Sequence, residues 1–217
     1  MVLLQVIAPQ QFITIPWKNG LGETTELAIN DGGTLDNFDW RLSIASVINE
    51  GFFSDFSGYQ RHLVLIAGQG LTLLHGSKDE SKDESKGGNK SSDNLTNLLA
   101  IATFDGACKT YGKLTAGAIK DFNIITNKQK ITSHVSCYVD AEQVTVNLAK
   151  SGVYFAYSLT NVMSVERKGQ ENTLVPQGAL LKISFVDEVH HIAKAKVKIN
   201  GQNMILVELI PTETDLL

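Results

Sequence analysis

Cysteine is scarce in this chain, and its scarcity excludes several kinds of site. Cys108 and Cys137 are the two cysteines among 217 residues, and their separation fits neither a disulfide framework nor a metal-binding motif. Both stand among apolar residues, so we expect buried free thiols. Free thiols suit a reducing compartment, and we therefore expect a cytoplasmic protein.

The histidines also lack the pattern of a metal site. Two strand histidines can chelate one ion when they stand at i and i+2, because they then share a face. The chain has no His-x-His: His62, His75 and His134 are isolated, and His190 and His191 are adjacent, which on a strand places them on opposite faces. We therefore expect no metal and no other cofactor.

Further absences limit the partners and the chemistry. No apolar run approaches the roughly 20 residues that span a bilayer, and the first residues, MVLLQVIAPQQF, have no basic region or cleavage site of a secretory signal. The net charge is −4 and the lysines are scattered, so we expect neither nucleic acid nor a membrane as partner. No nucleophile elbow and no glycine-rich phosphate loop before a helix occurs.

Short runs typical of β-strands fill the chain instead, and no convincing amphipathic helix is found. In the second half, turn residues such as Asn200-Gly201 separate the runs, and the spacing of roughly 8–12 residues per strand is typical of a β-sandwich or β-barrel. The strands expected there span residues 131–139, 143–148, 152–158, 162–166, 179–186, 191–199 and 204–210. The sequence predicts an all-β fold with two halves of similar strand content, divided near residue 126.

Residues 38–73, FDWRLSIASVINEGFFSDFSGYQRHLVLIAGQGLTL, organise the first half. Strict alternation places Arg41 on one face with Ser43, and Arg61 on a largely apolar face of a later strand. We expect these two strands to pair or to be neighbours. A guanidinium on an apolar face needs partners, because an unpaired buried charge is costly. It could bind a small anion, or it could form a structural ion pair or reach solvent at the strand end; alternation alone favours the latter group.

Two connections follow this stretch. Gly68-Gln69-Gly70 lies between two apolar runs and predicts a hairpin. Residues 76–94, GSKDESKDESKGGNKSSDN, contain SKDE twice in tandem and no apolar residue, so they cannot contribute to a core. The sequence predicts a flexible polar insertion loop there.

The motifs PWKNGLGETTELAI at residues 16–29, the stretch at 38–73 and DFNIIT at residues 121–126 resemble the HutD/Ves family. The resemblance implies a cupin-type fold with two double-stranded β-helix (jelly-roll) barrels in one chain, a bicupin. We expect the N-terminal barrel, with the ligand pocket, over residues 1–126 and the C-terminal barrel over 127–217. The family's association with histidine utilisation implies a small carboxylate ligand, such as formylglutamate or urocanate, and a regulatory role.

The polar residues of these motifs form the predicted ligand-binding set. Its members are Lys18, Asn19, Thr24, Glu26, Arg41, Ser43, Arg61 and Asn123, with Trp17 and Phe53 as an apolar lip. If they converge inside the first barrel, the arginines bind carboxylate oxygens, the hydroxyl and amide groups fix neutral atoms, and Glu26 holds one arginine or accepts from a ligand N–H. A cross-strand pair of Glu26 with Arg41 and a turn role for Asn19 remain the structural alternatives.

Three functions are compatible with this set. A metal-independent bicupin that binds a small carboxylate and regulates amino-acid catabolism is favoured. An enzyme acting on the same acids, a lyase, isomerase or hydrolase with Glu26 as base, is the alternative, although no second titratable group stands beside Glu26 in the sequence. A structural partner with a vestigial pocket is the third. The sequence leaves open whether the chain forms a homodimer.

Overall fold

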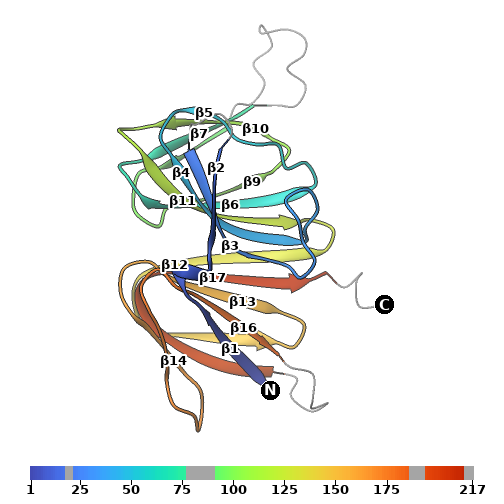
Figure 1. Ribbon diagram of the computed structural model, residues 1–217, viewed down its shortest axis with the longest axis vertical. Helices are drawn as coiled ribbons and strands as arrows, with labels where there is room; N and C mark the ends of the chain where they lie inside the picture. The colour runs from blue at the N-terminus through green and yellow to red at the C-terminus, as the bar shows by residue number, and fades with distance from the viewer. Residues whose placement is uncertain (18–21, 77–90, 186–193, 213–217) are drawn as a thin grey trace, which may run out of the picture. The chain divides into compact units, whose positions relative to one another are not determined.

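The computed structural model describes residues 1–17, 22–76, 91–185 and 194–212. Strands make up nearly all of its regular structure, and the one helical element among the described residues is the short 3-10 turn η1 (Pro9–Gln11) (Figure 1). The all-β prediction is confirmed. The chain forms two compact units: the central unit, Ile13–Gln129, and the terminal unit, which combines Met1–Phe12 with Lys130–Leu217.

Two sheets form the central unit. The larger sheet has the order β2 (Ile13–Pro16), β3 (Gly22–Ile29), β4 (Trp40–Val47), β11 (Ile119–Asn127), β6 (Tyr59–Ala67) and β9 (Ile101–Asp105). The smaller sheet has the order β5 (Gly51–Phe52), β10 (Lys109–Leu114), β7 (Leu71–Gly76) and β8 (Ser91–Leu95). Leu63 and Leu65 of the larger sheet share one apolar cluster with Leu71 and Leu73 of the smaller. The two sheets therefore pack face to face over a common core.

A single seven-stranded sheet forms the terminal unit. Its strands are ordered β1 (Val2–Ile7), β16 (Leu180–Phe185), β13 (Val153–Ser158), β17 (Lys194–Pro211), β14 (Met163–Glu166) and β15 (Thr173–Val175), and the long strand β12 (Ile131–Ala149) also pairs with β17. Its core includes Tyr154, Ile183 and Leu206.

The predicted boundary needs a correction at the N-terminus. Strand β1 pairs antiparallel with β16, and Val2, Leu4 and Val6 pack against the core of the terminal unit. The first twelve residues therefore belong with residues 130–217 and not with the first half of the chain. The short apolar run of β1 indicates a strand, but it carries no information about which distant strand completes the sheet.

The prediction of a hairpin at Gly68-Gln69-Gly70 is wrong. Strands β6 and β7 belong to different sheets, so this connection carries the chain from the larger sheet to the smaller one. Gly68 and Gly70 both have positive φ, 97° and 138°, and a Cβ on Gly68 would lie 2.6 Å from the Ile119 side chain. Glycine is needed here for the close crossing between sheets.

Four further points of the strand prediction need correction. Strand β17 continues through the expected turn at Asn200-Gly201, and β12 continues through residues 140–142 with a register shift. Strand β15 was not predicted. Within the predicted loop at 76–94, Ser91–Leu95 forms β8, because the polar run pairs with β7 as an edge strand; residues 77–90 lie outside the described residues.

Candidate functional site

The register of the larger sheet brings polar residues from distant parts of the chain into two neighbouring rows. One row across β4, β11, β6 and β9 contains Arg41, Ile125, Arg61 and Phe104. The next row, across β3, β4, β11 and β6, contains Glu26, Ser43, Asn123 and Leu63. Directly paired residues point to the same face of a sheet. The rows therefore place both arginines on one face.

The two arginine strands were expected to pair or to be neighbours, but they do neither. Strand β11 lies between β4 and β6, so that Arg41 and Arg61 both pair with Ile125 from opposite sides. Two strand spacings separate their Cα atoms by about 10 Å. The guanidinium groups thus enter the same face from well-separated strands.

A β-bulge in β3 changes the predicted alternation. The register shifts between Glu26, which pairs with Ser43, and Ala28, which pairs with Leu42. Ile29 then pairs with Arg41 and lies on the face of Glu26, although strict alternation predicts the opposite face. A bulge inserts one residue into a strand, and no feature of this sequence marked its position.

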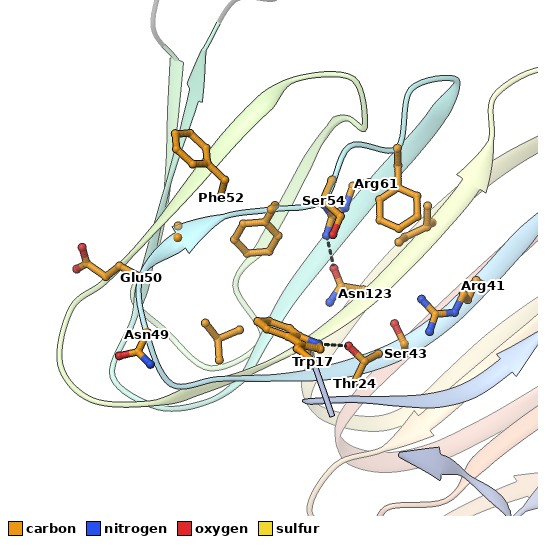
Figure 2. A pocket seen from close by; sticks show the side chains of 17 residues that line it. Trp17, Thr24, Arg41, Ser43, Asn49, Glu50, Phe52, Ser54, Arg61 and Asn123 are labelled. Carbon is orange, nitrogen blue, oxygen red and sulfur yellow. Dashed lines mark hydrogen bonds between the residues drawn. The ribbon is translucent and has the colours of Figure 1, made fainter. Parts of the chain in front are cut away.

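These rows lie beside a cavity of about 430 Å³ in the central unit (Figure 2). Five of the eight predicted ligand-binding residues line it, namely Thr24, Arg41, Ser43, Arg61 and Asn123, and so do both lip residues, Trp17 and Phe53. Glu26 is absent from the lining and contacts it through Arg41. Lys18 and Asn19 lie outside the described residues.

Arg61 is the most deeply buried cation of the cavity lining. The residue is 5 % exposed, its Nη2 donates to Asn123 Oδ1 at 2.9 Å, and its Nη1 donates to the Ser54 carbonyl oxygen at 3.5 Å. The buried Nε has no hydrogen-bond partner among the described residues. No carboxylate among those residues lies within ion-pair distance of the guanidinium, so the structural ion pair considered for Arg61 is not formed by the described chain.

Aromatic rings surround this guanidinium. Its Cζ lies 5.1 Å from the centroid of Phe53, 5.4 Å from Phe56 and 5.2 Å from Phe104. Cation–π attraction stabilises the charge, while burial lowers the pKa of Arg61 to about 10. The group therefore remains a cation at neutral pH.

Arg41 differs from Arg61 because it has a carboxylate partner. Its Nε donates to Glu26 Oε2 at 2.7 Å, and the two side chains are 9 % and 20 % exposed. The cross-strand pair expected as an alternative is therefore present. Arg41 still lines the cavity, and an arginine has further N–H donors beyond Nε.

The lip is held by a hydrogen bond. Trp17 Nε1 donates to Thr24 Oγ1 at 2.8 Å, and the Trp17 backbone N–H donates to the Gly22 carbonyl oxygen. A Cβ on Gly22 would lie 2.3 Å from the Ser46 carbonyl oxygen, so the close approach of β3 to β4 at this point requires glycine. The indole is thus fixed at the cavity (Figure 2).

Sequence reasoning missed part of the lining around β5. The additional polar and aromatic members are Asn49, Glu50, Phe52, Ser54 and Phe56. Glu50 Oε1 accepts from the Leu114 backbone N–H at 3.2 Å, which ties the loop before β5 to the end of β10. These residues stand in a turn-rich stretch without periodicity, so alternation could not assign them to a face.

Asp121 was also missed. It shares a strand face with Asn123, two residues away, and this alternation is a signal that could have drawn attention to it. Its side chain is fully buried, its Oδ1 accepts a hydrogen bond from Asn123 Nδ2, and burial raises the pKa of Asp121 to about 7 although the Arg61 charge opposes this. It does not line the cavity; it lies behind Asn123.

Other site types find little support in the described part of the chain. Its residues contain no group of three or more His, Cys, Asp or Glu arranged to hold a metal ion. Cys108 and Cys137 are free but only partly buried, which corrects the expectation of buried thiols; burial nevertheless raises the pKa of Cys137 to about 11. No helix within the described ranges is long and apolar enough to cross a membrane.

Similar proteins agree with the motif resemblance. The chain is 35 % identical over 155 residues to an uncharacterised 21.2 kDa protein in the hutC 3′ region of Pseudomonas putida, covering 71 % of this chain and 74 % of that one. It is 32 % identical over 143 residues to protein Ves of Citrobacter koseri, with 65 % and 66 % covered.

Solved structures show the same fold. HutD of Pseudomonas fluorescens, solved in a formate condition, matches with a TM-score of 0.75 and 25 % identity over 97 % of this chain and all of that one. A conserved protein of unknown function from Pseudomonas aeruginosa matches with a TM-score of 0.78, 24 % identity and coverage of 96 % and 99 %. Because the family model named HutD matches residues 10–203, this chain belongs to the HutD family.

Proposed function

We propose that the cavity of the central unit binds a small carboxylate and that the protein has a regulatory role in histidine or amino-acid catabolism. The observation that carries this proposal is Arg61: a buried guanidinium that lines the cavity with an unpartnered Nε and no carboxylate in contact among the described residues. A buried guanidinium with no carboxylate in direct contact is costly, and a bound carboxylate would supply that contact.

The distribution of arginine strengthens the case for an anion. Two of the chain's three arginines line this one cavity, and Ser43 and Asn123 add neutral hydrogen-bonding groups beside them. Because Glu26 neutralises Arg41 in part, Arg61 is the stronger candidate for the carboxylate itself. Arg41 is the candidate for a second polar group of the ligand.

The size and walls of the cavity fit a small organic acid. About 430 Å³ lies within the range of roughly 300–1,000 Å³ typical of small-molecule sites, which combine apolar walls with a few polar groups. Phe53, Phe56 and Trp17 supply apolar walls. We infer a ligand like formylglutamate or urocanate. The naming of the Pseudomonas putida relative by its hutC region supports a link to histidine utilisation.

We also propose that each compact unit is one cupin-type barrel, so that the chain is a bicupin. The division into two all-β units and the likeness to HutD of Pseudomonas fluorescens over nearly its whole length support this arrangement.

Thermal shift and calorimetry with formylglutamate, urocanate, glutamate and formate test the ligand proposal. A ligand at about 100 times its dissociation constant adds about 2.7 kcal/mol, which for a chain of this size raises Tm by roughly 5–10 °C. Arg61→Gln should abolish this shift. Arg167→Gln, which removes an arginine from the terminal unit, should retain it and serves as the matched control.

The proposal fails if none of these acids raises Tm or gives binding heat with the unaltered protein, or if Arg61→Gln binds as tightly as Arg167→Gln. Conversion of one of the acids to a product, followed by NMR, would instead favour the enzymatic alternative.

A further inference from the structure

A line of polar contacts runs from the cavity into the core and ends at Asp121. Arg61 Nη2 donates to Asn123 Oδ1 at 2.9 Å, and Asn123 Nδ2 in turn donates to Asp121 Oδ1. The second carboxyl oxygen, Asp121 Oδ2, is buried without a hydrogen-bond partner among the described residues. An unpartnered carboxylate oxygen in an apolar setting disfavours the charged form.

The surroundings of Asp121 are almost entirely apolar. It pairs with Ala45 on β4 and with Leu65 on β6, and both belong to the apolar cluster between the two sheets. The strands packed around Asp121 carry few charged or titratable side chains on the face directed toward it. These are Arg61 on β6, Arg41 on β4, Glu26 on β3, His75 on β7 and Asp93 on β8. Glu26 is already paired with Arg41, and His75 with Asp93, at 2.7 Å and 3.0 Å. Arg61 is the cation whose attraction favours ionised Asp121.

We propose that an anion binding at Arg61 enters together with one proton, which bonds to Asp121 Oδ2. This inference rests on the proposed function of the cavity. In the free protein, Arg61 and Asp121 balance each other's charge through Asn123. A bound anion offsets the guanidinium charge, so Asp121 loses the attraction that favours its ionised form. The proton comes from solvent, one O–H bond forms, and no oxidation or reduction occurs.

Proton uptake on anion binding should occur only within a defined pH range. Burial raises the pKa of Asp121 to about 7 in the free protein. Below this pH Asp121 already carries the proton, and binding takes up none. Above it, each anion that binds brings a proton, so affinity should fall by up to about tenfold per pH unit until the pKa of the anion-bound form is reached.

Titration calorimetry of the full chain with formate and with formylglutamate measures this uptake directly. Runs at one pH in two amine buffers of unequal ionisation enthalpy give the number of protons exchanged. We expect uptake approaching one proton per anion at pH 8 and close to none at pH 6. Binding with no uptake at pH 8 would overturn the inference while leaving the proposed function intact.

Asp121→Asn separates charge coupling from a structural role. The variant keeps an amide oxygen that can accept from Asn123 and removes the negative charge below Arg61. It should bind the anion about three- to tenfold more tightly at pH 8 than the unaltered protein, with no dependence on pH between 6 and 8. Asp36→Asn, which removes an exposed carboxylate, is the control and should keep the original pH dependence. Weaker binding by Asp121→Asn with an unchanged pH dependence would contradict the proposal.

A second measurement uses the unaltered protein, so its result does not depend on whether a variant folds. Infrared difference spectra at pH 8, recorded with and without formate, should show a buried carboxylic-acid carbonyl band appear on binding. Absence of that band under saturating formate would overturn the proton uptake. If no acid binds at all, the proposed function fails first, and the two failures are thereby distinguished.

Discussion

At the level of single residues, the candidate site contains two buried ionisable groups, and burying each of them costs free energy. The cost of burying the Arg61 charge is partly offset by aromatic rings and the Asn123 amide. The cost of burying the Asp121 charge is partly offset by the same amide and by the more distant Arg61 guanidinium. Alternation in the sequence predicted the face of Arg61 and of Asn123, because period-2 patterning is a local property. It did not predict that Asn123 would join Arg61 to Asp121, since that depends on the pairing of β11 with β6.

The first prediction concerns the stability of Asp121→Asn as a function of pH. The pKa of Asp121 is raised from 3.8 to about 7 in the folded protein, so between these values the native state binds a proton that the unfolded chain lacks. Asp121 therefore contributes stability below about pH 4 that is lost as pH rises to about 7. In urea titrations, the stability of Asp121→Asn relative to the unaltered protein should rise steadily from pH 4 to 7. The same comparison with Asp36→Asn should be flat; a flat result for both variants would contradict the assignment.

A second prediction tests whether the shape of the Arg61 side chain matters beyond its charge. Arg61→Lys keeps a cation but loses the planar group that spans Asn123, Ser54 and the three rings. We expect carboxylate affinity to fall at least about tenfold, because a bidentate contact is lost. Calorimetry against Arg167→Lys provides the comparison. Equal affinity of Arg61→Lys and the unaltered protein would show that a point charge suffices.

At the level of the elements, departures from regular strands shape the cavity. The bulge in β3 allows Glu26 to pair with Ser43 while Ile29 reaches the same face, and a register irregularity between Lys120 and Asp121 bends the pairing of β11 with β6. Many of the strands could be predicted from apolar alternation and turn residues. The bulges could not, because they depend on contacts across the sheet and not on neighbouring residues.

Paired glycines at the edge of the cavity give a prediction at this scale. Gly112 of β10 pairs with Gly51 of β5, yet a Cβ on Gly112 would lie 2.6 Å from the Phe53 ring while one on Gly51 would meet nothing within 4 Å. Gly112→Ala should displace the ring that stacks over Arg61, costing about 1–3 kcal/mol of stability and weakening ligand binding. Gly51→Ala should be nearly neutral. Denaturant titrations and calorimetry compare the two; equal effects would mean that Phe53 is not held by the space at Gly112.

At the level of the whole molecule, the chain crosses between its two units more often than its sequence suggests. The second boundary falls after Gln129, close to the predicted division at residue 126, because turn residues follow β11 there. The first boundary was missed, since β1 joins a sheet whose other strands begin more than a hundred residues later. Sequence separation of this size leaves no local signal. The motifs of the central unit could therefore predict residues that line the cavity without predicting which unit the N-terminus completes.

This arrangement predicts that damage to β1 is felt in one unit and not in the other. Leu4 pairs with Ile183 and packs against the core of the terminal unit, so Leu4→Asp places a charge against apolar side chains and should destabilise that unit by about 2–4 kcal/mol. Hydrogen exchange should accelerate in β13, β16 and β17, while β4, β6 and β11 keep their protection and the cavity keeps its ligand affinity. Leu3→Asp is the matched control, because Leu3 is 43 % exposed on the other face of the same strand. Faster exchange in β4 and β11 of Leu4→Asp would show that the two units unfold as one cooperative body, and the proposed carboxylate site would then depend on β1.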